Sequence, residues 1–236
     1  MERWSVSVLL FAVALLALPL TGCSGLNKDR SPEEWLSLSY AGLTGVDQYM
    51  YTGSLRIFAE NGIEFVPQTF EGKVIDHKQL NIQTSSEDPL LMNPVKALER
   101  LSRANSGAKV VTKEQTRGSV TLLITESGEA SHAEWSALLN QRMEQLADKG
   151  PLEEGKYKEE WNKEFAASKE QLDEMLRSLT AETTYELVID RNRLLPLKLE
   201  EHTLFNYSYK DQPRSENRHT SVRFQSFDGA ASKAVQ

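Results

Sequence analysis

The sequence predicts an α+β protein in which an antiparallel sheet packs against helices. Apolar residues alternate with a period of two in segments near both ends of the chain, whereas the stretch from about 131 to 179 repeats them at helical spacing. The dipeptide Asn61-Gly62 adds a third indication, because it is typical of the tight turn between antiparallel strands. We therefore expect a sheet interrupted by a long helical hairpin.

Composition excludes several classes of protein. The 236 residues are 39% hydrophobic and 26% charged, and a mean hydropathy of −0.47 argues against a multi-pass membrane protein. The formal net charge of −7 argues against nucleic-acid binding, which needs a basic surface. A single cysteine cannot form a disulfide framework.

The chain opens with an apolar run, Val6 to Leu20, which has the length of a signal sequence rather than of a membrane span. Leu20-Thr21-Gly22-Cys23 follows, and these residues resemble the lipobox of bacterial lipoprotein precursors. In that family a signal peptidase cleaves before the cysteine, and the thiol carries a diacylglyceryl group. The resemblance implies peptidase recognition at Leu20, Thr21 and Gly22 and lipidation at Cys23.

This resemblance divides the chain into a signal peptide (1–22), a lipidated tether (23–30), one α+β domain (31–229) and a frayed tail (230–236). Diacylglycerol on Cys23, with palmitate as an expected acyl group, would anchor the protein stably. We expect no other cofactor. The resemblance places the domain on the extracytoplasmic face of a bacterial membrane, without distinguishing inner from outer membrane.

The domain begins with a short helix that ends near 42–45. Ser31 can cap it, Pro32 suits its first position, and Glu34 can close a capping box. From Gln48 the alternation predicts a strand in which Gly53 marks a bulge. Further strands are expected at 63–66, 70–75, 80–84, 108–113 and 119–125, with a helix capped by Asn93-Pro94 and carrying Val95, Leu98 and Leu101.

The helical hairpin is expected at about 131–179. A capping box at Ser131 and Glu134 opens its first helix, Gly150-Pro151 ends that helix, and a second helix runs from about 153. Four aromatic side chains lie along the two apolar stripes, and core packing is favoured for them over a ligand-binding cluster. They are Trp135, Tyr157, Trp161 and Phe165.

The period of two returns after Thr180. Strands are expected at 184–189, 195–199, 205–209 and 220–227, with a turn at 190–193. Pro196 cannot donate a hydrogen bond to a neighbouring strand, so its strand lies at a sheet edge or the proline at a strand end.

No catalytic motif is found in the sequence. The histidines, His77, His132, His202 and His219, have no metal-like spacing and are interpreted as surface residues. Acidic pairs such as Glu159-Glu160 are interpreted as solvated helix faces. The sequence therefore predicts no enzyme, no catalytic residues and no metal site.

One stretch resembles the Lol-type and mycobacterial glycolipid-carrier lipoproteins. Tyr185 to Asp190 forms a strand ending in Asp, a turn follows from Arg191 to Leu195, and Pro196 leads into Leu197-Lys198-Leu199. The resemblance implies a half-barrel of curved sheet whose concave face, covered by helices, accommodates acyl chains. The hairpin at 131–179 departs from that pattern as an insertion or an enlarged lid, so no ligand-binding residue is transferred.

Three functions remain open, in this order. The first is a non-catalytic interaction or assembly module at the cell envelope, whose hairpin engages a protein partner. The alternative is a lipid or lipoprotein carrier that binds acyl chains in the half-barrel. A weaker alternative is an envelope hydrolase, which only the abundant carboxylates favour.

Overall fold

The computed structural model describes residues 30–65, 67–76, 78–84, 94–103, 107–111, 118–151 and 155–228. The predicted signal peptide, nearly all of the tether and the predicted tail lie outside these residues. Within the described ranges, no helix is both long and apolar enough to cross a membrane. The part of the chain from Pro32 onward groups into one compact unit.

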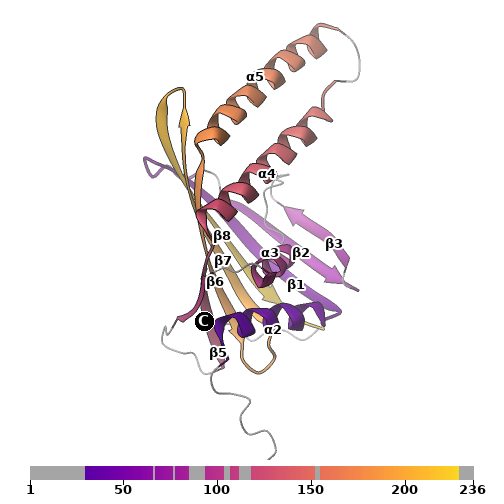
Figure 1. Ribbon diagram of the computed structural model, residues 1–236. Coiled ribbons are helices and arrows are strands. Elements are labelled where there is room, and N and C mark those ends of the chain that lie inside the picture. The colour runs from indigo at the N-terminus through magenta and orange to yellow at the C-terminus, as the bar shows by residue number, and fades with distance from the viewer. Residues whose placement is uncertain are drawn as a thin grey trace, which may run out of the picture. The chain divides into compact units, whose positions relative to one another are not determined.

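Among the described residues, one antiparallel sheet of eight strands forms the frame of this unit, in the order β3-β2-β1-β8-β7-β6-β5-β4. The sheet curves, with helices against one face (Figure 1), which confirms the predicted α+β class and the curved antiparallel sheet. The strands are β1 (Gln48–Ala59), β2 (Gln68–Ile75), β3 (Lys78–Thr84), β4 (Gly107–Val111), β5 (Ser119–Thr125), β6 (Thr180–Asp190), β7 (Pro196–Tyr209) and β8 (Gln212–Gln225).

Two short helices, α2 (Pro32–Thr44) and α3 (Pro94–Arg103), pack on the inner, concave face. The helix α2 begins at Pro32 as predicted, and α3 buries Leu98 and Leu101 completely. These side chains join strand residues such as Leu187 and Leu199 in one apolar cluster. We call it the main core; it occupies the concave side under α2 and α3.

The helical hairpin lies between β5 and β6 and consists of α4 (Gly128–Ala147) and α5 (Lys156–Ser178). Its predicted start at Ser131 is wrong. Ser127 is the N-cap, and its side chain accepts a hydrogen bond of 3.2 Å from the Ala130 amide. Ser131 is instead buried in the first turn and donates to Glu126 at 3.3 Å. Both serines precede apolar positions at helical spacing, so the pattern alone favoured the wrong one.

Four backbone predictions have clear outcomes. A turn does form at Asn61-Gly62, with Gly62 at φ 78° and the Ala59 amide donating to the Ile63 carbonyl at 2.9 Å. The predicted strand at 63–66 is wrong, because the described residues there form no strand and make an isolated bridge, between Phe58 and Glu64. Pro196 opens β7, at a strand end. The bulge at Gly53 is wrong, because the pairing is unbroken there on both sides of β1. A Cβ at Gly53 would lie 2.1 Å from the Phe70 ring, so close packing requires this glycine.

Strands β7 and β8 are longer than predicted. The expected segments 195–199 and 205–209 belong to one continuous strand, and β8 begins at Gln212 rather than near Thr220. The missed residues include Glu201 and Arg218, which are polar but buried on the concave side. They break the apolar alternation on which the prediction depended.

Candidate functional site

The hairpin presents apolar side chains that the domain does not bury. The 23-residue helix α5 has no fully buried residue, Tyr157 is 72% exposed and Leu146 46%. Trp161 and Phe165 are half-buried and stack on one another, with ring centroids 6.4 Å apart. The prediction that Tyr157, Trp161 and Phe165 are core residues is therefore wrong. We call Leu146, Tyr157, Trp161 and Phe165 the hairpin surface.

The position of α4 and α5 explains this exposure. Both helices extend past the end of the sheet (Figure 1), so their outer turns have no strand to cover. Trp161 lies against the end of α4, where a Cβ at Gly150 would come within 2.6 Å of the indole Nε1. The two helices therefore meet near their connection, and the remaining apolar area is left to solvent.

The base of the hairpin is held firmly. Trp135 is buried, as predicted, and its ring meets Phe205 edge to face with centroids 4.8 Å apart. The Arg218 guanidinium lies 4.7 Å from the centre of the same indole ring. Leu179 and Ala181 complete a second, smaller apolar cluster at this position. The hairpin is thus fixed at its base and exposed beyond it.

A belt of buried polar groups separates this small cluster from the main core. Arg218 Nη1 donates to Glu201 Oε1 at 2.9 Å, and both side chains are buried. The hydroxyls of Thr183 and Thr203 lie 3.1 Å apart on the same face, and Thr220 is buried beside them. Burial raises the pKa of Glu201, while Arg218 opposes this effect. We call these five residues the polar belt.

A second polar group fastens α3 and α4 to the sheet. Arg100 on α3 donates to Glu126 at 2.5 Å and to the Tyr185 hydroxyl at 2.6 Å, and it also pairs with Glu134 on α4. Burial, with Glu201 next in size, raises the pKa of Tyr185 above its ordinary value. Arg100 therefore pairs with the carboxylates of Glu126 and Glu134 together, and such an arrangement is typical of structural ion pairs.

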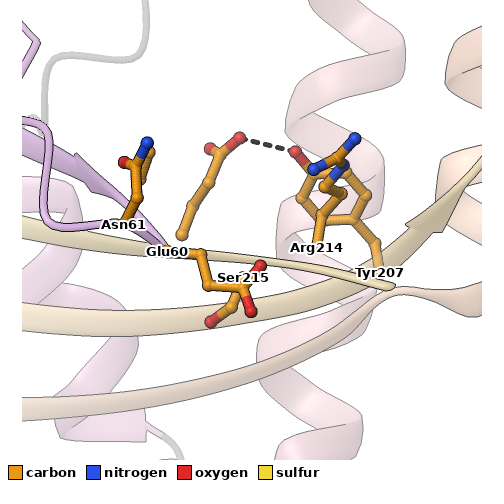
Figure 2. A pocket seen from close by; sticks show the side chains of 7 residues that line it. Glu60, Asn61, Tyr207, Arg214 and Ser215 are labelled. Atoms are coloured by element: carbon orange, nitrogen blue, oxygen red, sulfur yellow. Dashed lines mark hydrogen bonds between the residues drawn. The ribbon is translucent and has the colours of Figure 1, made fainter. Parts of the chain in front are cut away.

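A pocket of about 450 Å³ lies beside the β7–β8 turn and the end of β1. Figure 2 shows the side chains of its lining, in which the Tyr207 hydroxyl donates to Glu216 at 2.5 Å. Six of the seven lining residues are of polar or charged types, whereas pockets for acyl chains are mainly lined by hydrophobic side chains. The lining residues are Ala59, Glu60, Asn61, Tyr207, Arg214, Ser215 and Glu216.

Two of the four histidines meet on the sheet. The register of β7 and β8 places His202 opposite His219, and their rings stack with centroids 4.1 Å apart and planes 9° from parallel. Glu200 joins them, and the three side chains bring their ligand atoms within 4.8 Å of one another. Burial, followed by the neighbouring His202, lowers the pKa of His219. His132 lies apart on α4, and His77 is outside the described residues.

Sequence reasoning did not find this histidine grouping, because the signal lies in the strand register rather than in residue spacing. His202 and His219 would have been paired by extending the β7–β8 hairpin outward from its turn at Lys210-Asp211. Recognising that hairpin required Glu200 to Leu204 to be placed in a strand.

The predicted lipidation site lies outside the described residues. Leu20, Thr21, Gly22 and Cys23 all precede Arg30, the first described residue, so the anchor stays a prediction. Comparison with known proteins adds no family to this description, because no family model and no curated protein matches the chain.

Proposed function

We propose that the protein is a lipid-anchored lipoprotein on the extracytoplasmic face of a bacterial membrane, where it acts as a non-catalytic interaction module. The single observation that carries this proposal is the hairpin surface, with Tyr157 72% and Leu146 46% exposed. Apolar side chains gathered on a surface and surrounded by charged residues mark protein interaction sites. The partner is an envelope protein that contacts the exposed turns of α4 and α5.

The way the hairpin is mounted supports the same function. Trp135, Phe205 and Arg218 hold its base against the sheet, so its outer part is presented in a defined direction. An anchor at Cys23 would keep the domain at the membrane surface and leave this part free to meet a partner there. A helix pair that is already fixed in position loses fewer degrees of freedom on binding than a disordered segment does. It therefore binds a partner more tightly.

Site-specific photocrosslinking in intact membranes tests this proposal. The full chain carries a photoreactive phenylalanine analogue at Tyr157, or at Leu204 as a matched control. Leu204 is also apolar and exposed, at 38%, but lies on the sheet. We expect a discrete protein adduct from position 157 and none from 204, and the adduct is lost when Trp161→Glu is added. Equal adducts from both positions, or none from 157, would contradict the proposal.

A lipid or lipoprotein carrier remains the second candidate. The curved antiparallel sheet with helices against its concave face supports it, since this is the arrangement implied by the resemblance to Lol-type carriers. The main core counts against it, because Leu98, Leu187 and Leu199 are fully buried on that concave side. Side chains therefore already occupy space that acyl chains would need.

Lipid analysis separates the two candidates. The full chain is extracted from membranes in detergent, and non-covalently bound lipid is measured by mass spectrometry against an unrelated lipoprotein purified in the same way. The interaction module predicts no enrichment over that background. One acyl ligand per protein would place the carrier first.

A further inference from the structure

The histidine pair lies on the face of the sheet opposite the main core. Successive residues of a strand point to opposite faces, and Leu199, Glu201 and Thr203 are buried on the concave side. Glu200 and His202 therefore face outward, away from α2 and α3. His219 shares that outer face, because it is the direct partner of His202 in the register of β7 and β8.

The three side chains form a compact set of metal-ligand atoms. Glu200, His202 and His219 each offer one atom, and these atoms lie within 4.8 Å of one another. His219 Nε2 is 3.7 Å from Glu200 Oε1. This nitrogen is buried, and no hydrogen-bond partner reaches it within the described part of the chain. A buried polar atom without a partner is costly, which points to a missing ligand at this place.

We propose that Glu200, His202 and His219 bind a divalent transition-metal ion, with zinc as the fitting species. Two imidazoles and one carboxylate are a common set of three protein ligands for zinc, with water in the fourth position. Ligand bonds of about 2.0–2.1 Å place tetrahedral ligand atoms about 3.4 Å apart. The register already fixes the backbone positions of the three residues, so the movement that the proposal requires is rotation of their side chains.

The surroundings provide an entry path and a competing cation. His202 is exposed, so an ion can approach from solvent. Lys198 Nζ lies 2.7 Å from Glu200 Oε1 and holds that carboxylate in place. A bound ion would displace the Lys198 ammonium group as the cation nearest to the Glu200 carboxylate.

Calorimetric titration with ZnCl₂ tests the site. The protein is the full chain in detergent, with Cys23→Ala in every sample so that the thiol cannot bind the ion. We expect one Zn²⁺ per chain, and His202→Ala or Glu200→Gln should weaken binding by more than about tenfold. His132→Ala is the matched control, because His132 is a half-buried histidine on α4 outside the cluster.

A second readout separates ligation from a general effect on folding. Co²⁺ in place of Zn²⁺ should give the intense visible absorption of a tetrahedral site, and His202→Cys should retain binding with a spectrum shifted by sulfur ligation. Because His202 is exposed, its substitution leaves the core intact, and circular dichroism checks this. Absence of saturable Zn²⁺ binding to the parent chain overturns the proposal. Binding that His202→Ala and Glu200→Gln leave unchanged overturns it as well.

Discussion

The buried ion pair of the polar belt gives the sharpest test of how this fold is stabilised. The side chains of Glu201 and Arg218 are 6% and 4% exposed. We expect Glu201→Leu to be strongly destabilising, because it leaves the Arg218 guanidinium charged and buried without its carboxylate. Replacing both partners by apolar residues, as Glu201→Leu with Arg218→Met, should be much milder.

The magnitudes follow from the surroundings of the pair. Removing one partner of a buried ion pair costs about 3–5 kcal/mol in free energy of unfolding, whereas replacing both is often neutral or stabilising. Arg218→Met also removes the contact with the Trp135 ring at 4.7 Å, which is worth about 2 kcal/mol when desolvated. The double variant should therefore lie within about 2 kcal/mol of the parent chain.

The assay is urea unfolding of the parent, the two single variants and the double variant, followed by circular dichroism and tryptophan fluorescence. Arg56 and Glu64 provide the matched control pair, with N and O atoms 2.6 Å apart and side chains 46% and 30% exposed. Because solvent screens this pair, Glu64→Gln should leave the unfolding midpoint unchanged within error. The reasoning is refuted if Glu201→Leu and Glu64→Gln have equal effects, or if the double variant is less stable than Glu201→Leu.

Four further predictions follow from single contacts. Leu98→Ala should lower the free energy of unfolding by about 2–5 kcal/mol in a urea titration, because Leu98 is fully buried in the main core. Gly53→Ala should cost about 1–3 kcal/mol in the same titration, since its Cβ would meet the Phe70 ring. Burial raises the pKa of Tyr49 above 10.0, so its contribution to stability is present below that pH and is lost as pH rises. Tyr49→Phe should therefore lose about 1 kcal/mol less than the parent between pH 10 and 11 in urea titrations at both values. Lys198→Met should tighten Zn²⁺ binding about two- to fivefold by calorimetry, because it removes the ammonium that competes for Glu200.

Strand patterning was predictable where one face is uniformly apolar. In β6, Tyr185, Leu187 and Ile189 are buried in alternation, and the period of two found this strand. In β7 the inward-facing positions continue from Leu199 to Glu201. Glu201 is charged, so an apolar residue no longer identifies the inward face there. The polar belt therefore hid the long β7–β8 hairpin, and with it the pairing of the histidines.

The helical hairpin of α4 and α5 shows a different limit of sequence reasoning. Helical spacing correctly indicated that α4 and α5 each have an apolar face. The spacing does not say whether another part of the fold covers that face. Trp135 and Tyr157 lie in the same kind of pattern, yet the first is buried against Phe205 and the second is 72% exposed. The difference depends on how far each helix extends past the sheet.

The register of β7 and β8 connects the two proposals. The same pairing that places Glu201 near Arg218 on the concave face places His202 opposite His219 on the outer face. A slip of one residue would exchange the two faces, so the buried ion pair beneath the hairpin specifies the register on which the metal ligands depend. An ion bound by Glu200, His202 and His219 would in turn stabilise the paired strands that carry Phe205 and Arg218, the contacts of Trp135. Metal binding on the outer face and presentation of the hairpin surface therefore both rely on one pair of strands.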